Sequence, residues 1–203
     1  MLERFKVPDQ HRVYVEEDRM RDATKKIFLK MGLSDKDATL STDVLMLSDL
    51  RGCESHGVSN MLRGYVAQYD NGELNPRPNI RTVRESDTTA TLDSDNGLGL
   101  HVAPYAMEIA MEKADRFGLG SVAVASGNHV GMLAYHAMMA LPRDMIGVCM
   151  IGATPVMVPT FGAEPRLSTN PIAWAVPARR MPPFVFDAAT TAVANNKLSL
   201  ASR

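Results

Sequence analysis

Two histidines lie in short, glycine-flanked segments where their rings could transfer protons. Residues 51–58 read Arg-Gly-Cys-Glu-Ser-His-Gly-Val, and residues 126–131 read Ser-Gly-Asn-His-Val-Gly. His56 follows an expected helix, so its ring could stand at the mouth of a loop with Ser55 fixing its tautomer. His129 follows an expected strand and precedes a helix, which is where α/β proteins place ligand-binding loops. The two rings could therefore face one cleft.

Other roles for these residues stay open on local spacing alone. His56 could end a helix by bonding to a backbone carbonyl, and His129 could cap the helix that comes after it. Cys53, close to His56, could be the nucleophile of a hydrolase if its thiol pKa were lowered. The remaining histidines fall within strand or helix patterns and are expected to be structural or solvated: His11, His101 and His136.

Metal and nucleotide motifs give a weaker signal. Cys53 and Cys149 lack the ligand spacing of a zinc centre, so no metal site is expected. The chain contains neither G-x-G-x-x-G after a strand nor a P-loop. The turn 187–192, Asp-Ala-Ala-Thr-Thr-Ala, could hold an anion on the free amides of a helix N-terminus. It could equally be a plain helix start with Asp187 or Thr190 as its cap.

Composition bounds the class of protein. The 203 residues are 45% hydrophobic, and 22 basic against 23 acidic residues leave a formal charge of -1. A chain with so little net charge has no strong positive electrostatic field to attract nucleic acid or an acidic membrane surface, so neither partner is expected. No apolar run approaches the roughly 20 residues of a membrane span. Two cysteines without paired spacing favour the reducing cytoplasm.

Hydrophobic periodicity predicts alternating helices and strands, hence an α/β fold. Helices are expected over 16–31, over 35–50 with Ser34 as N-cap, from 61 to a stop at 71–72, and over 101–117 and 132–141. Strands are expected over 11–15, 80–84, 88–93, 121–125, 145–151, 172–176 and 184–187. The continuous apolar run 145–151 is typical of a strand buried on both faces. We divide the chain into an N-terminal helical region, 1–78, and an α/β region, 79–203.

Four motifs occur in a fixed order across residues 15–203: 49–58, 127–131, Thr-Asn-Pro at 169–171, and Asp-Ala-Ala-Thr-Thr at 187–191. With these motifs the chain resembles the malate/L-lactate dehydrogenase family that includes ureidoglycolate, sulfolactate and 2,3-diketogulonate-type enzymes. The resemblance implies an N-terminal helical part joined to a mixed-sheet cofactor-binding domain of the sulfolactate dehydrogenase type. That fold differs from the ordinary Rossmann fold.

The resemblance also implies an activity. It is an NAD(P)-dependent transfer of hydride between nicotinamide and C2 of a small 2-hydroxy or 2-keto carboxylate. His56 is then the first choice for the proton relay, with Ser55 as its neighbour and His129 as a second acid/base or orienting residue. Arg63 could clamp the substrate carboxylate. Asn60 is also expected to contact the substrate, and many relatives carry an arginine at its position, so the identity of the substrate stays open.

By the same resemblance, one set of residues is expected to line NAD or NADP: Thr154, Asn170, Pro171, Phe186, Asp187, Ala188, Ala189, Thr190 and Thr191. Asp187 could instead orient a catalytic histidine. Family members are longer homodimers, and the chain stops at Arg203 without the look of a finished C-terminus. The alternative hypothesis is therefore a truncated, non-catalytic subunit or oligomerisation module that retains the fold.

Overall fold

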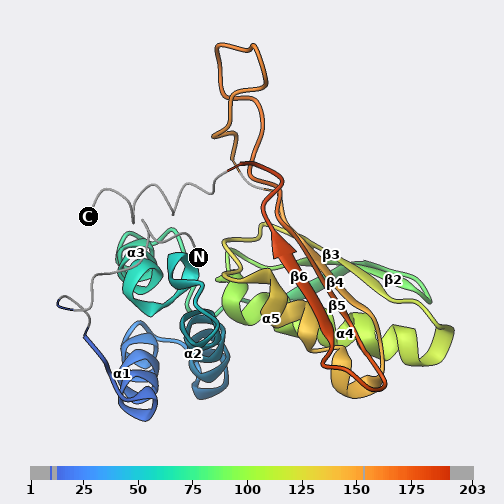
Figure 1. Cartoon of the computed structure of the whole chain (residues 1–203), viewed down its shortest axis with the longest axis horizontal. Helices are drawn as coiled ribbons and strands as arrows, with labels where there is room; N and C mark the ends of the chain where they lie inside the picture. The colour runs from blue at the N-terminus through green and yellow to red at the C-terminus, as the bar shows by residue number, and fades with distance from the viewer. Residues whose placement is uncertain (1–9, 11–12, 153, 193–203) are drawn as a thin grey trace.

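The computed structural model describes residues 10, 13–152 and 154–192 (Figure 1). Its chain begins with coil where the alternating pattern 11–15 predicts a strand. Residues 11–12 lie outside the described residues, and Val13, Tyr14 and Val15 are exposed coil. The prediction of a strand is wrong for these three residues. An alternating pattern forms a strand only when a neighbouring strand takes up its backbone hydrogen bonds.

Three helices form the N-terminal part, as the periodicity predicts: α1 (Glu17–Lys30), α2 (Asp35–Leu50) and α3 (Val58–Asp70). Ser34 caps α2, its hydroxyl accepting a hydrogen bond from the Asp37 amide at 3.1 Å. Phe28, Leu45 and Tyr65, one from each helix, are fully buried in the shared core. The amphipathic faces of the helices therefore pack against one another.

The first sheet is mixed and contains β1 (Arg81–Glu85), β2 (Thr89–Asp93) and β3 (Ser121–Ala125). β1 and β2 pair antiparallel, whereas β2 and β3 pair parallel. The helix α4 (Gly99–Phe117) connects β2 to β3 along the chain. Gly118 ends α4 at a φ of 79°, a left-handed conformation that glycine adopts without strain. The helix starts two residues before the predicted range and ends where predicted.

The second sheet is antiparallel and contains β4 (Gly147–Met150), β5 (Ile172–Val176) and β6 (Phe184–Ala188). It comes after α5 (Leu133–Met138) and the 3-10 turn η4 (Leu141–Arg143), and α5 packs on it through Leu133 and Ala137. The loop between β4 and β5 projects from the body of the protein (Figure 1).

The prediction that 145–151 is buried on both faces is wrong for this structure. Within the described residues β4 is an edge strand, and Met150 is 67% exposed. Its sequence has the apolar character of an interior strand, yet its outer edge faces an open groove.

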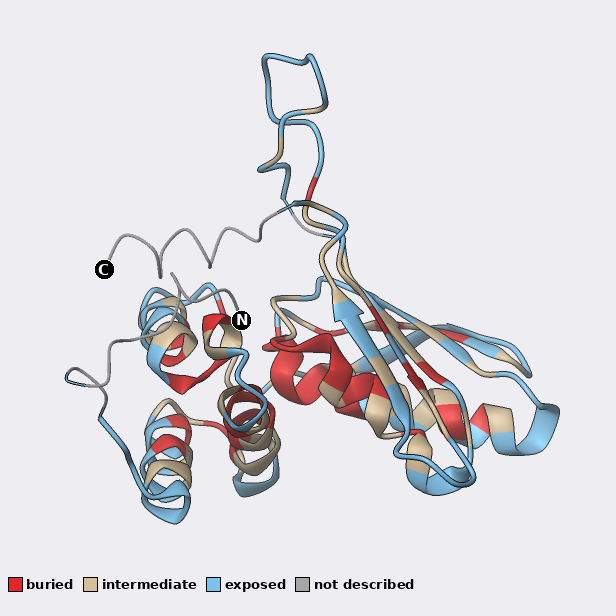
Figure 2. Ribbon diagram, viewed as in Figure 1, coloured by how far each residue is buried: buried red, intermediate tan, exposed pale blue. Residues whose placement is uncertain are grey.

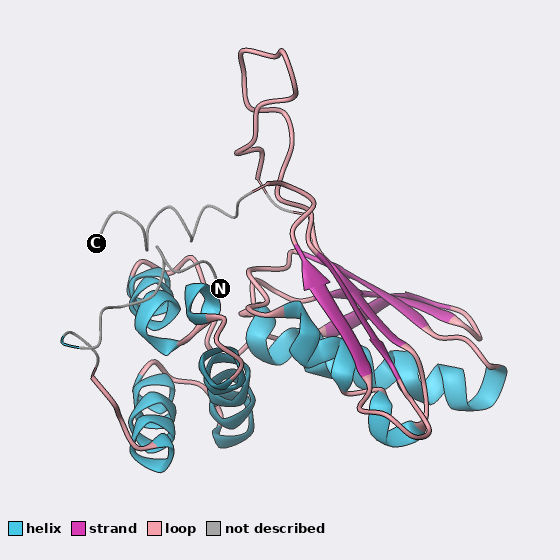
Figure 3. Ribbon diagram, in the orientation of Figure 1, coloured by secondary structure: helices cyan, strands magenta, loops and turns pink. Residues whose placement is uncertain are grey.

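Helices α1–α3 gather on one side and all strands of the described part on the other (Figure 3). Leu98 and Leu100, at the start of α4, belong to the same buried cluster as the helical core. Figure 2 shows this buried zone around α2 and the start of α4. The two regions thus share a core, and a boundary at 78/79 stays a prediction. None of the helices described is long and apolar enough to cross a membrane.

Candidate active site

His56 lies on a short 3-10 turn, η3 (Glu54–His56), held between α2 and α3. The Asp49 carboxylate accepts a hydrogen bond from the Val58 amide at 2.8 Å and so caps the start of α3. A Cβ at Gly57 would lie 1.7 Å from Asp49 Oδ1, so only glycine allows this cap. The aspartate and the glycine of the motif therefore fix where the histidine stands.

Ser55 and Asn60 complete this turn. The buried Ser55 hydroxyl lies 3.0 Å from His56 Nδ1, as expected of a residue that fixes the tautomer. Asn60 donates from Nδ2 to the Ser55 carbonyl at 2.9 Å. In this structure Asn60 thus supports the turn that carries His56.

His129 lies on the loop between β3 and α5, pressed against the start of α4. A Cβ at Gly99 would stand 2.5 Å from the Asn128 carbonyl oxygen and 2.7 Å from that of His129. The contact therefore requires a glycine at the first residue of α4. Because Leu98 and Leu100 anchor that end of α4 in the helical core, the loop is fixed relative to α1–α3.

The two histidine rings meet at the junction of the helical and α/β parts. Their centroids are 5.5 Å apart and the ring planes differ by 17°, a stacked arrangement. The structure thus brings together two residues that the sequence places on separate motifs. A protonated His56 would repel a protonated His129 at this distance, so the two rings are electrostatically linked.

Tyr65, on α3, is a site residue that the sequence did not reveal. Its hydroxyl lies 2.6 Å from His129 Nδ1, and the Gly131 amide donates to the same nitrogen at 3.3 Å. Since an amide N–H can only donate, Nδ1 carries the lone pair and the neutral ring carries its proton on Nε2. In the sequence, Tyr65 has the spacing of one more apolar position of a helix.

Burial gives this arrangement its electrostatic character. Desolvation, and then the proximity of His56, lower the pKa of His129 from 6.5 to about 4. Burial also raises the pKa of the Tyr65 hydroxyl far above its ordinary value. At neutral pH both groups are therefore uncharged, with Tyr65 donating to Nδ1 and the ring proton of His129 on Nε2.

We expect Tyr65→Phe to leave only the Gly131 amide on His129 Nδ1, to weaken the hold on the tautomer, and to lower turnover about tenfold, the value of one buried hydrogen bond. Nitrogen chemical shifts of His129 measure the tautomer directly. Tyr69→Phe is the matched control, because Tyr69 lies on the same helix and its buried hydroxyl bonds to nothing in the described part of the chain. Unchanged His129 shifts in Tyr65→Phe would contradict this role.

The expected cofactor residues converge in part at one end of the β4–β5–β6 sheet. Thr190 donates from both its amide and its hydroxyl to the Thr169 carbonyl, each at 3.0 Å. Ile172 pairs with Ala188, which places Asn170 and Pro171 beside residues 188–190. Phe186 stands on β6 and is 46% exposed, and Thr154 is exposed in the loop after β4.

The carboxylate of Asp187 bonds to the start of α5 and not to a catalytic histidine. Its carboxylate accepts hydrogen bonds from the Ala134 amide, at 2.7 Å, and from Leu133, so it caps the first turn of α5. Burial raises its pKa, while these amides and the charge of Arg51 lower it. The orientation of a histidine by Asp187 is therefore not what the structure shows. No helix begins within 187–192, and residues 193–203 lie outside the described residues.

Arg63, the predicted clamp for the substrate carboxylate, stays a prediction. It is exposed on α3, two positions from Tyr65. At 3.6 residues per turn, two positions place the side chains on nearly opposite faces of the helix. Among the residues described, no three His, Cys, Asp or Glu side chains gather in a way that could hold a metal ion.

Residues 15–203 match the profile of the family described as malate/L-lactate dehydrogenase. The chain belongs to the malate/L-lactate dehydrogenase family. Malate dehydrogenase of Pyrococcus abyssi is 40% identical over 195 residues, covering 96% of this chain and 53% of that protein. L-sulfolactate dehydrogenase of Methanocaldococcus jannaschii is 38% identical over 87% of this chain and 51% of its own length.

Solved structures of the family have the same fold. The structure of Pyrococcus horikoshii malate dehydrogenase matches with a TM-score of 0.91 at 39% identity, covering 96% of this chain and 55% of that one. Sulfolactate dehydrogenase from Methanocaldococcus jannaschii matches with a TM-score of 0.88 at 35% identity, covering 94% and 55%. The predicted family and fold class are confirmed. The chain spans about half the length of these relatives. Membership of a dehydrogenase family does not support the hypothesis of a hydrolase with Cys53 as nucleophile and His56 as its partner.

Proposed function

We propose that this chain provides the proton-transfer part of an NAD(P)-dependent dehydrogenase acting on a small 2-hydroxy or 2-keto carboxylate. The observation that carries the proposal is the stacked pair of His56 and His129, with Tyr65 and the Gly131 amide both bonded to Nδ1 of His129. Reduction of a 2-keto acid at C2 needs a hydrogen-bond donor to the carbonyl oxygen and a source for the proton that the oxygen gains. Two histidines in different environments can supply both.

The two rings suit different tasks. His129 presents Nε2–H and is held neutral, so it suits the donor that polarises the substrate carbonyl. It is a poor net proton source, because replacing the lost proton through Nδ1 would require a charged Tyr65, which burial opposes. His56 is half-exposed beside Ser55 and can exchange protons with solvent. We therefore assign proton transfer to His56.

A cation must bind the substrate carboxylate, and Arg51 suits this task better than Arg63. Arg51 comes directly after α2 and precedes the turn of His56, and its charge reaches Asp187 on β6. Arg63 lies on the far side of α3 from Tyr65. An arginine can grip a carboxylate with two parallel hydrogen bonds, which would orient C2.

The residues gathered at one end of the β4–β5–β6 sheet suit a portion of a dinucleotide cofactor. The Asn170 amide, the Thr191 hydroxyl and the exposed Phe186 ring suit a group with amide and hydroxyl functions and one flat face. When bound, NAD or NADP would accept or donate the hydride. Residues 170–171 and 186–191, with Thr154, would hold it, and both cofactors remain in the proposal. A homodimer and a cytoplasmic location belong to the same proposal and rest on the family resemblance.

The test is an assay of the purified chain with NAD or NADP and malate, lactate, sulfolactate or ureidoglycolate. We expect reduced nicotinamide to form with at least one pair, and to disappear when the matching 2-keto acid is offered. The second candidate is a non-catalytic module that keeps the fold; the chain spans about half the length of its relatives. Absence of cofactor binding by calorimetry, together with a stable dimer by light scattering, would establish that module and refute the enzyme.

A further inference from the structure

A buried serine and a buried histidine join α2 to the first turn of α4. The Ser41 hydroxyl, on α2, lies 3.2 Å from Nδ1 of His101, the third residue of α4. The two residues are 0% and 2% exposed, and His101 Nε2 bonds to nothing among the residues described. Within the described part of the chain, the contact with Ser41 is therefore the single hydrogen bond of this imidazole.

This pair has no part in the proposed proton transfer, and burying two polar groups costs desolvation free energy that an apolar pair would avoid. Burial lowers the pKa of His101, so at pH 7 its ring is neutral and the pair has no ionic attraction. Apolar contacts such as those of Leu98 and Leu100 in the shared core are non-directional. A hydrogen bond requires a fixed distance and direction, so the Ser41–His101 bond can set how α4 lies against α2.

Gly131 lies in the contact between α2 and α4 beside this bond. A Cβ at Gly131 would stand 2.7 Å from Leu100 Cδ2 and 2.8 Å from Val44 Cγ1, so the space admits no side chain. Leu100 directly precedes His101 on α4. Val44 lies about one helical turn beyond Ser41 on α2. The spacing of the two helices at the hydrogen bond therefore also decides where Gly131 lies.

The Gly131 amide is the group that distinguishes the two tautomers of His129. The Tyr65 hydroxyl could donate to Nδ1 or accept from it, whereas an amide N–H can only donate. The amide lies 3.3 Å from Nδ1, which is longer than the usual distance of about 2.9 to 3.0 Å for such bonds. A displacement of roughly half an ångström would therefore break this bond.

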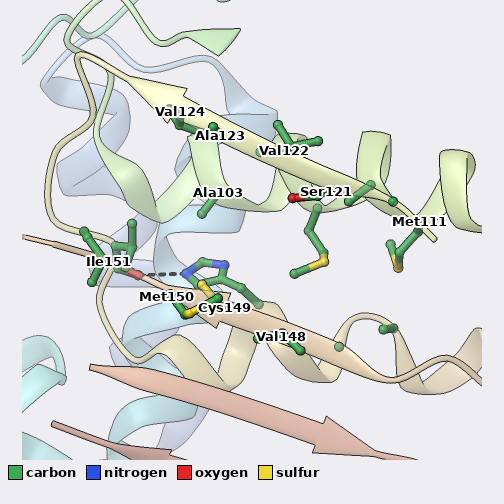
Figure 4. A pocket seen from close by; sticks show the side chains of 18 of the residues that line it. Ala103, Met111, Ser121, Val122, Ala123, Val124, Val148, Cys149, Met150 and Ile151 are labelled. Carbon is green, nitrogen blue, oxygen red and sulfur yellow. Dashed lines mark hydrogen bonds between the residues drawn. The ribbon is translucent and has the colours of Figure 1, made fainter. Parts of the chain in front are cut away.

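The other side of the same loop is held by α5. Nε2–H of His136 donates to the Val130 carbonyl at 2.8 Å, the contact drawn as a dashed line in Figure 4. Val130 separates His129 from Gly131 in the chain, so the loop keeps this bond when the contact between α2 and α4 changes. Loss of the Ser41–His101 bond should thus displace Gly131 without unfolding the loop.

We propose that Ser41 and His101 are positioning residues for His129. Their hydrogen bond sets the distance between α2 and α4, and this distance keeps the Gly131 amide on Nδ1 of the His129 ring. Both act through the packing around Gly131. Their effect on turnover rests on the proposed function, in which His129 polarises the substrate carbonyl, whereas their effect on the ring does not.

Ser41→Ala removes the hydroxyl and with it the directional contact. We expect part of the His129 population to change to the tautomer with its proton on Nδ1, so the two nitrogen chemical shifts of the ring move toward each other. The Gly131 amide should exchange with solvent about tenfold faster, the value of one hydrogen bond. Nuclear magnetic resonance of the 203-residue chain measures both without substrate or cofactor.

Thr42→Ala is the matched control on the same helix. Thr42 is 1% exposed, but its hydroxyl donates to the Ala38 carbonyl within α2 and does not connect α2 to α4. This variant loses a buried hydroxyl as Ser41→Ala does. We expect it to leave the His129 nitrogen shifts and the exchange rate of the Gly131 amide unchanged.

Two substitutions of His101 test the bond from its other end. In His101→Asn the side-chain amide can take the place of Nδ1 and keep a hydrogen bond to Ser41, whereas in His101→Leu no such group remains. We expect asparagine to retain the original His129 shifts and leucine to reproduce the effect of Ser41→Ala. Because Ser41→Ala and His101→Leu remove the same bond, one of them that circular dichroism shows to be folded is sufficient.

The outcomes separate positioning from general stability. Original His129 shifts in the folded Ser41→Ala and His101→Leu proteins would overturn the proposal. An equal change in Thr42→Ala would also overturn it, because the effect would then follow from stability alone. Changed shifts with an unchanged rate of 2-keto acid reduction would support the positioning of the ring and would refute instead the role of His129 in the proposed function.

Discussion

His56→Ala is expected to lower turnover by a factor of about 10² to 10⁴, the usual contribution of a positioned acid/base group. The physical reason is that no second group replaces it: His129 is held neutral with its lone pair directed at Tyr65, so it cannot deliver a net proton. Substrate affinity should change far less than turnover, because the carboxylate is bound elsewhere. Initial rates of 2-keto acid reduction, with kcat and KM separated, measure the effect.

Two variants delimit this prediction. Ser55→Ala keeps the imidazole but removes the hydroxyl 3.0 Å from Nδ1, so an intermediate loss is expected. Arg63→Ala should retain most of the original rate if Arg51 binds the carboxylate, because Arg63 is exposed on the face of α3 opposite Tyr65. A His56→Ala protein with full activity would remove His56 from the mechanism. Circular dichroism of each variant shows whether the fold is retained.

His129→Gln is the second large effect, with turnover falling by about 10² to 10³, as when one donor to a developing oxyanion is lost. Glutamine offers an amide donor but cannot reproduce the fixed direction that Tyr65 and Gly131 impose on the imidazole. Turnover with the same 2-keto acid measures the loss. Retention of the original rate would contradict the assignment of the carbonyl-polarising donor to His129.

The pH dependence of His129 gives an independent measurement. The pKa of its ring should be about 4 by nuclear magnetic resonance, well below the ordinary 6.5. Because folding lowers this pKa, the unfolded chain binds the proton more readily, and the associated stability is present above 6.5 and lost as the pH falls through about 4. In the folded protein the neutral donor is lost only as the pH falls through about 4. A midpoint near the ordinary pKa would refute the buried, neutral state.

Much of this site can be predicted from the sequence, because it depends on contacts between residues that are close together in the chain. The turn needs a glycine at position 57 to admit the Asp49 carboxylate. The Ser55 hydroxyl contacts the ring of His56, the next residue in the chain. The helices that carry them are predicted by 3.6-residue periodicity and by the cap at Ser34. Gly118 and the Asn71–Gly72 stop likewise end their helices through local backbone preferences.

The tertiary structure alone decided which distant groups meet. Tyr65 reaches His129 from another element, and a buried tyrosine on a helix has no local pattern that distinguishes a hydrogen-bond partner from core packing. Asp187 lies in a recognisable motif, yet its carboxylate caps α5 because β6 runs beside that helix end. The spacing of Arg63 from His56 in the sequence suits a clamp for the substrate carboxylate, but Arg63 lies on the face of α3 that is turned away from Tyr65.

By itself the sequence determined the family, the motifs and the order of helices and strands, because these depend on residues close together in the chain. The tertiary structure determined the tautomer of His129, the neutral state of its ring and the open edge of β4. Each of these depends on desolvation or on a contact between separate elements. Such effects act through space, so they have no counterpart in the local spacing of residues.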